Sequence, residues 1–330
     1  MQSVASALSE GILPEAFRGF EEELCDGAVR GLDVDQLAGY DEWARWLGWA
    51  SVELDEGDYL RAALYGLYLA PRLAGTDYGT ARQRDLGQLW TDIIRGFLGE
   101  IAFAKWLRER FGLAVELDYS LGPLEQFLPS DIKRVGGREP RLRVSVKTTK
   151  LGGIWLDVPG AQVEHSDVFV LVRVGATREH FLAFLKKISV IRDKLMKEAR
   201  ERGLLSEEEL EKIWESVPEF KSVPAYVAGF LDKADYADRL KDRYSIIEAD
   251  GEVKQRRAVI NRYLGFWHPG EAAYERTLRD LLRRRGRGLR DDMRVEFEGI
   301  GEFSRTLHFI ASSGVLKKRK EDWERLVQRL

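Results

Sequence analysis

The chain has 330 residues, with 52 lysines and arginines against 55 aspartates and glutamates, so its formal net charge is −3. Charged residues make up 32% and aromatic residues 11% of the chain, a composition that indicates a packed globular protein and argues against disorder. Cys25 is the single cysteine, which excludes an intrachain disulfide, and the four histidines are scattered without the spacing of a metal-ligand set.

Residues 1–86 have a largely helical pattern. The apolar runs of the chain are too short to cross a membrane, and the first residues lack a basic start followed by an apolar block, so we expect a cytoplasmic protein. Trp43, Trp46 and Trp49 recur at three-residue steps. Such a stripe can stack on nucleic-acid bases, but it more often packs into a core, and we expect the core here.

A helix is predicted from Gly87 to Arg110, and it carries an acid on its apolar face. Glu100 lies among residues that share one side of the helix. Because an unpaired buried carboxylate is costly, Glu100 needs a metal, a cation or a proton, unless it sits at the edge of the stripe and points to water. Gly96 and Gly99 are unfavourable inside a helix and indicate that another backbone passes close by. The predicted stripe consists of Ile93, Gly96, Glu100, Phe103 and Leu107.

The pattern of residues 131–149 predicts a β-hairpin with a turn at 136–140. Its second strand alternates between apolar and polar residues from 141 to 149. With the turn centred near Arg138, Asp131 falls opposite Ser145, and Lys147 is a diagonal neighbour. One face of the hairpin then collects an acid, a hydroxyl and an amine, while the other face can pack on the Glu100 helix. The alternative is a solvated hairpin with mixed charges.

Further strands are predicted at 154–158, 167–174, 180–185 and 225–231, and the second of these should be buried on both faces. Residues 186–224 are predicted to be an insertion of two charged helices, in which Ser206 and Glu209 have the spacing of a capping box. Together these elements predict an α/β fold with a mixed sheet flanked by helices.

The C-terminal part carries the densest positive charge. Between residues 276 and 290 there are seven arginines and one acid, Asp280. Such a cluster can neutralise DNA phosphates, although its charges could instead pair with acidic segments elsewhere in the chain. Residues 317–320 form a second basic run. The expected DNA-binding arginines are Arg276, Arg279, Arg283, Arg284, Arg285, Arg287 and Arg290.

Three short segments resemble the PD-(D/E)XK nuclease superfamily, the fold of many type II restriction endonucleases. The helix motif of that family matches Gly96-Phe97-Leu98-Gly99-Glu100. Pro129-Ser130-Asp131 approximates the first strand motif, with Ser130 inserted. Ser145-Val146-Lys147 approximates the second, with a serine where the family usually has an acid. The resemblance extends over roughly residues 87–185.

The resemblance implies a restriction-endonuclease-like nuclease core at 87–245, including the insertion, between an N-terminal helical region (1–86) and a basic C-terminal region (246–330). It implies a Mg²⁺ site, with Mn²⁺ able to substitute, held by Glu100, Asp131 and the backbone carbonyl of Val146. Glu164, or less favourably Asp157, could supply the acid missing at Ser145; Glu100 and Asp131 could also suffice without it. Lys147 would orient or deprotonate the attacking water.

The implied activity is Mg²⁺-dependent hydrolysis of double-stranded DNA by a type II restriction enzyme, acting as a homodimer because two strands need two sites. Two alternatives stay open: a repair or defence nuclease of the same fold, and an inactive DNA-binding protein in which Ser145 marks the loss of activity. Residues 227–235 are also similar to the LAGLIDADG motif of homing endonucleases. Ala234 stands where that family needs an acid, so a strand followed by a turn is predicted there.

Overall fold

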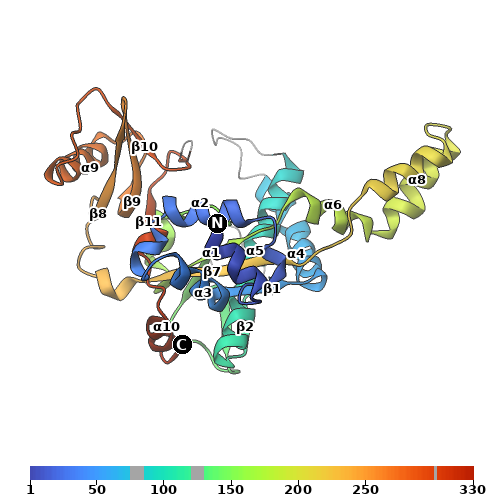
Figure 1. Cartoon of the computed structure of the whole chain (residues 1–330), viewed down its shortest axis with the longest axis horizontal. Coiled ribbons are helices and arrows are strands. Elements are labelled where there is room, and N and C mark those ends of the chain that lie inside the picture. Colours follow the sequence, from blue (N-terminus) through green and yellow to red (C-terminus); the bar gives the residue numbers. More distant parts are fainter. Residues whose placement is uncertain (75–84, 120–129, 301–302) are drawn as a thin grey trace.

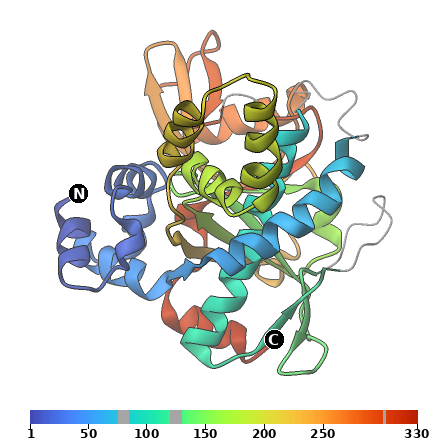
Figure 2. The same ribbon diagram turned by 90° about the vertical axis from the view of Figure 1, so that its right-hand side faces the viewer.

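The computed structural model describes residues 1–74, 85–119, 130–300 and 303–330 (Figure 1). A central body lies between two projections: a sheet with one helix at one end, and a helical arm at the other (Figure 1). Figure 2 shows the molecule with the arm toward the viewer.

The central sheet has the strand order β1 (Ser51–Leu54), β7 (Val223–Asp232), β6 (Val168–Val174) and β4 (Val144–Lys150). β4 pairs with β6 in parallel, whereas β6 with β7 and β7 with β1 are antiparallel. Every residue of β6 and β7 is buried, as their nearly continuous apolar sequences predict. The predicted α/β class with a mixed sheet and flanking helices is confirmed, and β4 is an edge strand of that sheet.

One face of the sheet packs on α4 (Glu56–Ala74), α5 (Leu86–Phe111) and α10 (Lys320–Val327). α5 lies between α4 and the sheet. On the α4 side Gly66 lies against Trp90 and Ile94, and on the sheet side Gly99 lies against Thr148. Of the predicted stripe, Phe103 and Leu107 are buried, whereas Ile93, Gly96 and Glu100 are only partly buried. α5 also buries residues outside that stripe, which a single-stripe pattern does not describe.

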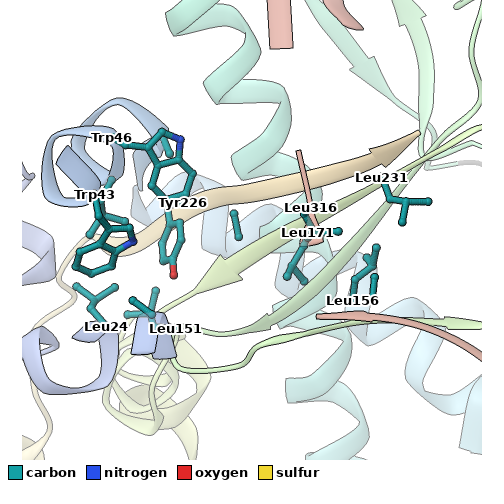
Figure 3. Close-up of a cluster of buried hydrophobic side chains, with 14 of the residues drawn as sticks. Leu24, Trp43, Trp46, Leu151, Leu156, Leu171, Tyr226, Leu231 and Leu316 are labelled. Carbon is teal, nitrogen blue, oxygen red and sulfur yellow. The ribbon is translucent and has the colours of Figure 1, made fainter. Parts of the chain in front are cut away.

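The other face of the sheet packs on the N-terminal helices α1 (Gln2–Ser9), α2 (Glu21–Arg30) and α3 (Tyr40–Ala50) and on strands of a second sheet. Figure 3 shows Trp43 and Trp46 of α3 in this core beside Tyr226 of β7. Trp43 is fully buried and Trp49 is partly buried against the same cluster, so the tryptophan stripe belongs to the core as expected. Short 3₁₀ turns η1 (Glu15–Phe17) and η2 (Asp33–Gln36) connect these helices.

The second sheet has the order β10 (Arg294–Phe297), β9 (Arg257–Trp267), β11 (His308–Ser312) and β5 (Trp155–Pro159), and β8 (Ile246–Lys254) pairs with β9. α9 (Ala272–Arg284) packs on this sheet through Leu278 and Leu282. The 3₁₀ turns η3 (Gly160–Glu164), η5 (Lys233–Tyr236) and η6 (Ser313–Val315) follow β5, β7 and β11. β7 thus ends in a turn, as predicted for residues 227–235.

The predicted hairpin ladder is wrong. β3 (Ile132–Val135) pairs with β2 (Val115–Leu117) and not with β4. The end of the chain lies beside the connection that would close the hairpin, because the Arg141 N–H donates to the Leu330 carbonyl at 3.1 Å. Only the start of the hairpin is present: the Asp131 N–H donates to the Val144 carbonyl at 2.8 Å, which preserves the predicted position of Asp131 next to Ser145.

The predicted strand at 180–185 is also wrong, because these residues lie in helix α6 (Arg178–Lys186). Thr177 and His180 form a capping box, and the buried residues His180, Ala183 and Phe184 have helical spacing. The arm continues through the π-helix η4 (Ile191–Met196), α7 (Lys197–Glu201) and α8 (Glu207–Ser216). The capping box predicted at Ser206 and Glu209 is confirmed.

The basic run at 317–320 does not form a continuous surface patch, because Lys318 is fully buried. Its amine donates to Asp33 Oδ1 at 2.8 Å, and the buried Arg173 of β6 donates to Asp33 Oδ2 at 2.9 Å. Arg173 also hydrogen-bonds Tyr226 and Ser313. This buried ion cluster joins η2, the central sheet and the C-terminal segment.

The two glycines of α5 offer a matched stability test. A Cβ at residue 99 would lie 1.8 Å from Thr148 Oγ1 and 2.8 Å from Thr148 Cβ, whereas a Cβ at residue 96 would meet no described atom within 4 Å. We expect Gly99→Ala to destabilise the protein by about 1–3 kcal/mol through overpacking. Gly96→Ala should stabilise it by about 0.5–1 kcal/mol through helix propensity. Urea denaturation measures both, and equal effects would contradict the close approach at Gly99.

Candidate active site

The free edge of β4 positions the site. The Arg143 carbonyl accepts from the Val168 N–H of β6 at 3.1 Å. Because successive residues of a strand direct their backbone groups to opposite sides, those of Val146, three residues further on, point away from β6. The Val146 N–H donates to Asp131 Oδ2 at 2.6 Å, which shows that Val146 faces the free edge. Since a strand residue directs its N–H and C=O to the same side, the Val146 carbonyl also faces that edge.

Asp131 is held at this edge by its backbone and by its side chain. Besides the bond to Val146, its carboxylate is hydrogen-bonded by the Ser145 hydroxyl. The neighbouring Ser130 hydroxyl accepts from the Val144 N–H at 3.1 Å and donates to the Ile132 carbonyl at 2.9 Å. These bonds fix the start of β3 against β4. Pro129, the first residue of the predicted motif, lies outside the described residues.

Glu100 reaches the same place from α5. The contact of Gly99 with Thr148 and the hydrogen bond from Thr148 Oγ1 to the Gly96 carbonyl, at 3.2 Å, hold α5 on β4 at this level. Burial raises the pKa of Glu100 well above its ordinary value, and the Asp131 carboxylate raises it further, while Lys147 opposes the shift. The structure therefore brings together two acids that disfavour each other's ionised form.

Lys147 completes the group. Its amine donates to Gln162 Oε1 of η3 at 2.6 Å. Burial lowers the pKa of Lys147, and the carboxylates of Asp131, Glu100 and Asp157 act in the opposite direction. Burial likewise raises the pKa of Asp131, against the effects of Lys147 and of the Val146 N–H. Glu100, Asp131, Ser145 and Lys147, all named from the sequence, thus form one cluster.

The two candidates for the missing acid lie in different places. Glu164 is exposed at the end of η3 and forms an ion pair with Arg243 at 2.7 Å, outside the contacts that define the cluster. Asp157 of β5 lines a hollow of about 290 Å³ together with Lys147. It also bonds His308 Nδ1 at 2.8 Å, and this pair raises the pKa of His308 although burial opposes the rise. The structure therefore places Asp157, and not Glu164, beside Lys147.

Sequence reasoning missed Gln162 and His308. Gln162 precedes Glu164 by two residues, and an uncharged amide does not stand out in a segment where a carboxylate is the expected ligand. His308 is 151 residues away from Asp157, and only the pairing of β11 with β5 brings them together. No spacing within the sequence signals that contact.

The donor set fits a hard divalent cation that keeps part of its water shell. In the parts of the chain that the structure describes, no group of three or more histidine, cysteine, aspartate or glutamate side chains gathers in a metal-binding arrangement. Glu100 and Asp131 supply two carboxylates, and Val146 supplies a carbonyl on the same edge. Mg²⁺ is commonly bound through one or two carboxylates, waters and phosphate oxygens, so these groups are sufficient for it.

A second hollow, of about 880 Å³, lies between α4, α5 and β2. Its lining is mixed in charge, with Arg61, Lys105 and Arg108 alongside Asp55, Asp58 and Glu116, and it includes Tyr119, whose ring stacks on Tyr65 at 4.1 Å. None of the cluster residues lines this hollow, whereas Lys147 lines the hollow of about 290 Å³.

The C-terminal arginines are more paired than the sequence indicates. Five of the seven form ion pairs: Arg279 with Glu275, Arg283 with Asp280 and Asp291, Arg285 and Arg287 with Asp250, and Arg290 with Asp292. For Arg276 and Arg284 no ion pair forms within the described ranges. The acidic neighbours offset much of the local charge, so these two are the strongest candidates for contact with phosphates.

Comparison of the chain with models of protein families, with curated proteins and with solved structures found no match. Among the described residues, none of the helices combines the length and the apolar character that a membrane crossing demands. The geometry of the cluster is therefore the main guide to function.

The raised pKa of Glu100 has a measurable consequence for stability. Glu100 has a higher pKa in the folded than in the unfolded state. Such an acid lowers the stability of the fold progressively as the pH rises above the pKa that the acid has in the unfolded chain. We expect Glu100→Gln, measured in EDTA at neutral pH, to have a higher Tm than the wild type, with the difference vanishing at acid pH. Glu164→Gln is the matched control and should show no such gain. An equal Tm for Glu100→Gln and wild type across pH would contradict the placement of Glu100.

A bound divalent cation should stabilise the folded state, whereas the ionised form of Glu100 destabilises it. At a hundredfold excess over Kd, a bound ion stabilises the folded state by about 2.7 kcal/mol. We expect Mg²⁺ to raise the Tm of the wild type but not that of Asp131→Asn, as followed by thermal denaturation without substrate. An equal shift in both proteins would show that Asp131 does not hold the ion.

Proposed function

We propose that this protein is a Mg²⁺-dependent endodeoxyribonuclease of restriction type. The observation that carries the proposal is the convergence of Glu100, Asp131 and Lys147 at the free edge of β4. Two acids whose ionised forms oppose each other, next to an amine, suit a site where a cation and a phosphodiester meet. The resemblance to the PD-(D/E)XK superfamily, found in the same residues, supports the same reaction.

Glu100, Asp131 and the Val146 carbonyl would hold Mg²⁺, with Mn²⁺ as a substitute. The ion would polarise the scissile phosphate and lower the pKa of a bound water. The bonds from Val146 and Ser145 to Asp131 keep that carboxylate oriented before any ion arrives. Such preorganisation is what a catalytic ligand needs.

Lys147 acts on the phosphate side of the reaction in this proposal. Its amine has three N–H donors, and the bond to Gln162 accounts for one of them. The remaining donors can offset charge on the transition-state oxygens or orient the attacking water. Gln162 then acts as a positioning residue, because it fixes the amine without touching the reacting atoms.

Of the two acids considered for this role, Asp157 is better placed than Glu164 to compensate for the serine at position 145. It shares the hollow next to Lys147, and its bond to His308 fixes its orientation.

The alternative function, a DNA-binding protein without activity, rests on Ser145 itself, which occupies the position of an acid and hydrogen-bonds Asp131. Double-stranded DNA as partner and a homodimer as assembly belong to the same proposal, because cutting both strands takes two sites.

A digest of defined DNA separates the alternatives. Discrete fragments in Mg²⁺ would support the restriction role, and diffuse or structure-dependent cutting would support repair or defence. Binding without any cutting, in Mg²⁺ and in Mn²⁺, would support the inactive protein and overturn the proposed activity.

Single substitutions test the cluster. We expect Asp131→Ala or Lys147→Ala to lower metal-dependent cleavage by about 10²-fold or more, since each removes a group that acts on the reaction, while DNA binding survives. Lys150→Ala is the control, because Lys150 lies exposed at the end of the same strand. Cleavage retained by both Asp131→Ala and Lys147→Ala would remove the assignment.

Charge reversal tests the DNA surface. We expect Arg276→Glu with Arg284→Glu to weaken DNA binding and to lower the slope of log K against log salt by about 0.9 for each phosphate that the variant no longer neutralises. Lys194→Glu, at an exposed position of the helical arm, should leave both quantities unchanged. A salt slope equal to that of the wild type would show that α9 does not face the DNA.

A further inference from the structure

A pocket of about 700 Å³ lies along β10 and the end of β9, on the second sheet. Three aromatic residues, Trp267, Phe297 and Phe303, line it. The ring centroids of Trp267 and Phe297 are 5.0 Å apart, and those of Phe297 and Phe303 are 5.1 Å apart. Phe297 is buried, whereas Trp267 and Phe303 keep part of their surface exposed, so their rings are accessible from the pocket. We call this the Trp267–Phe303 pocket.

The rim of the pocket is polar and carries both hydrogen-bond donors and acceptors. Arg294 and Arg305 are exposed donors, and Glu296 is an acceptor that pairs with Arg294 at 3.7 Å. His268 also lines the pocket, with Nε2 3.7 Å from Glu271. An apolar aromatic wall with a rim of this kind matches a flat heterocycle that has polar edges.

The pocket adjoins the Glu100–Lys147 cluster. Ile300 lines both the Trp267–Phe303 pocket and the 290 Å³ hollow that contains Lys147 and Asp157. A strand whose phosphate lies at Lys147 can therefore continue across Glu298–Ile300 toward the aromatic rings. The pocket therefore differs from an ordinary surface hollow, because it is connected to the place where the DNA backbone would be cut.

We propose that the Trp267–Phe303 pocket binds one unpaired nucleobase of the strand held at Lys147, and this rests on the proposed nuclease function. The base stacks on the exposed ring faces, and Arg294, Arg305 and Glu296 contact its polar edge. Stacking on aromatic side chains is the general means by which proteins hold unpaired bases, and a flipped base needs an enclosed pocket of this kind. The base comes either from a single strand or from a duplex that releases it.

The test uses full-length Lys147→Ala protein with Mg²⁺ and labelled DNA in which a single abasic residue is moved along the strand. One arm uses single strands, and the other uses duplexes with one unpaired base. We expect loss of the base at one position, and only there, to weaken binding by about tenfold. The arm that shows this effect identifies the source of the base.

Phe303→Leu should remove that position dependence, because a leucine fills space but offers no ring to stack on. The salt dependence of binding should not change, since the groups that neutralise phosphates stay in place. Phe220→Leu, the same exchange in an aromatic cluster with Tyr59 near α4, is the control. Arg305→Ala, at an exposed position, gives a second test if Phe303→Leu does not fold.

The outcomes separate this proposal from the nuclease proposal. If the abasic residue weakens binding equally at all positions, or if the position dependence persists in Phe303→Leu, the base-binding proposal is wrong. Cleavage by the wild type would in that case still support the nuclease proposal. Position-dependent binding without any wild-type cleavage would support the pocket and overturn the nuclease. Absence of all DNA binding would overturn both.

Discussion

The hydrogen bond from the Val146 N–H to the Asp131 carboxylate determines how the site is built. β4 is an edge strand, and the next strand would normally supply a carbonyl at this position. Asp131 supplies a side-chain oxygen instead, and β3 then turns away to pair with β2. The edge is thus closed at the Val146 N–H by a side chain, so a single exchange of acceptor ends the sheet at the place where the Mg²⁺ site is proposed.

The same arrangement has a cost in stability. Glu100 and Asp131 lie close together in a buried place, and burial raises the pKa of both. Lys147 offsets only part of their mutual repulsion. For stability alone, apolar or neutral side chains would suit these positions better. Side chains that lower stability in this way are typical of functional sites.

The sequence predicted the members of the cluster better than the structure around them. Glu100, Asp131 and Lys147 could be named because an acid on an apolar helix face and an alternating strand are local patterns. The hairpin prediction failed because the partner of β3 depends on β2 and on the position of Leu330, which no local pattern encodes. The prediction for residues 180–185 failed because a short run of apolar and aromatic residues fits both the periodicity of a helix and that of a strand. Gln162 and His308 were missed because contacts between distant elements define their roles.

Charge was the least reliable guide. A run of basic residues does not show which of them finds a partner: Lys318 lies in the core, and most C-terminal arginines pair with acids. Arg285 and Arg287 pair with Asp250, which lies on β8. The buried ion cluster shows the converse effect, since nothing in the sequence around Asp33, Arg173 and Lys318 indicates that they meet.

Asp33 and Lys318 are separated by 285 positions, and Arg173 lies between them along the chain. A charge that leaves water for the interior needs its counterpart at once, so Arg173 and Asp33 cannot reach their final burial until the segment around Lys318 arrives. Contacts at such long separation close late and slowly during folding. During synthesis, the finished central sheet, and with it the proposed DNA-cutting site on its edge, would appear only after the segment around Lys318 has left the ribosome.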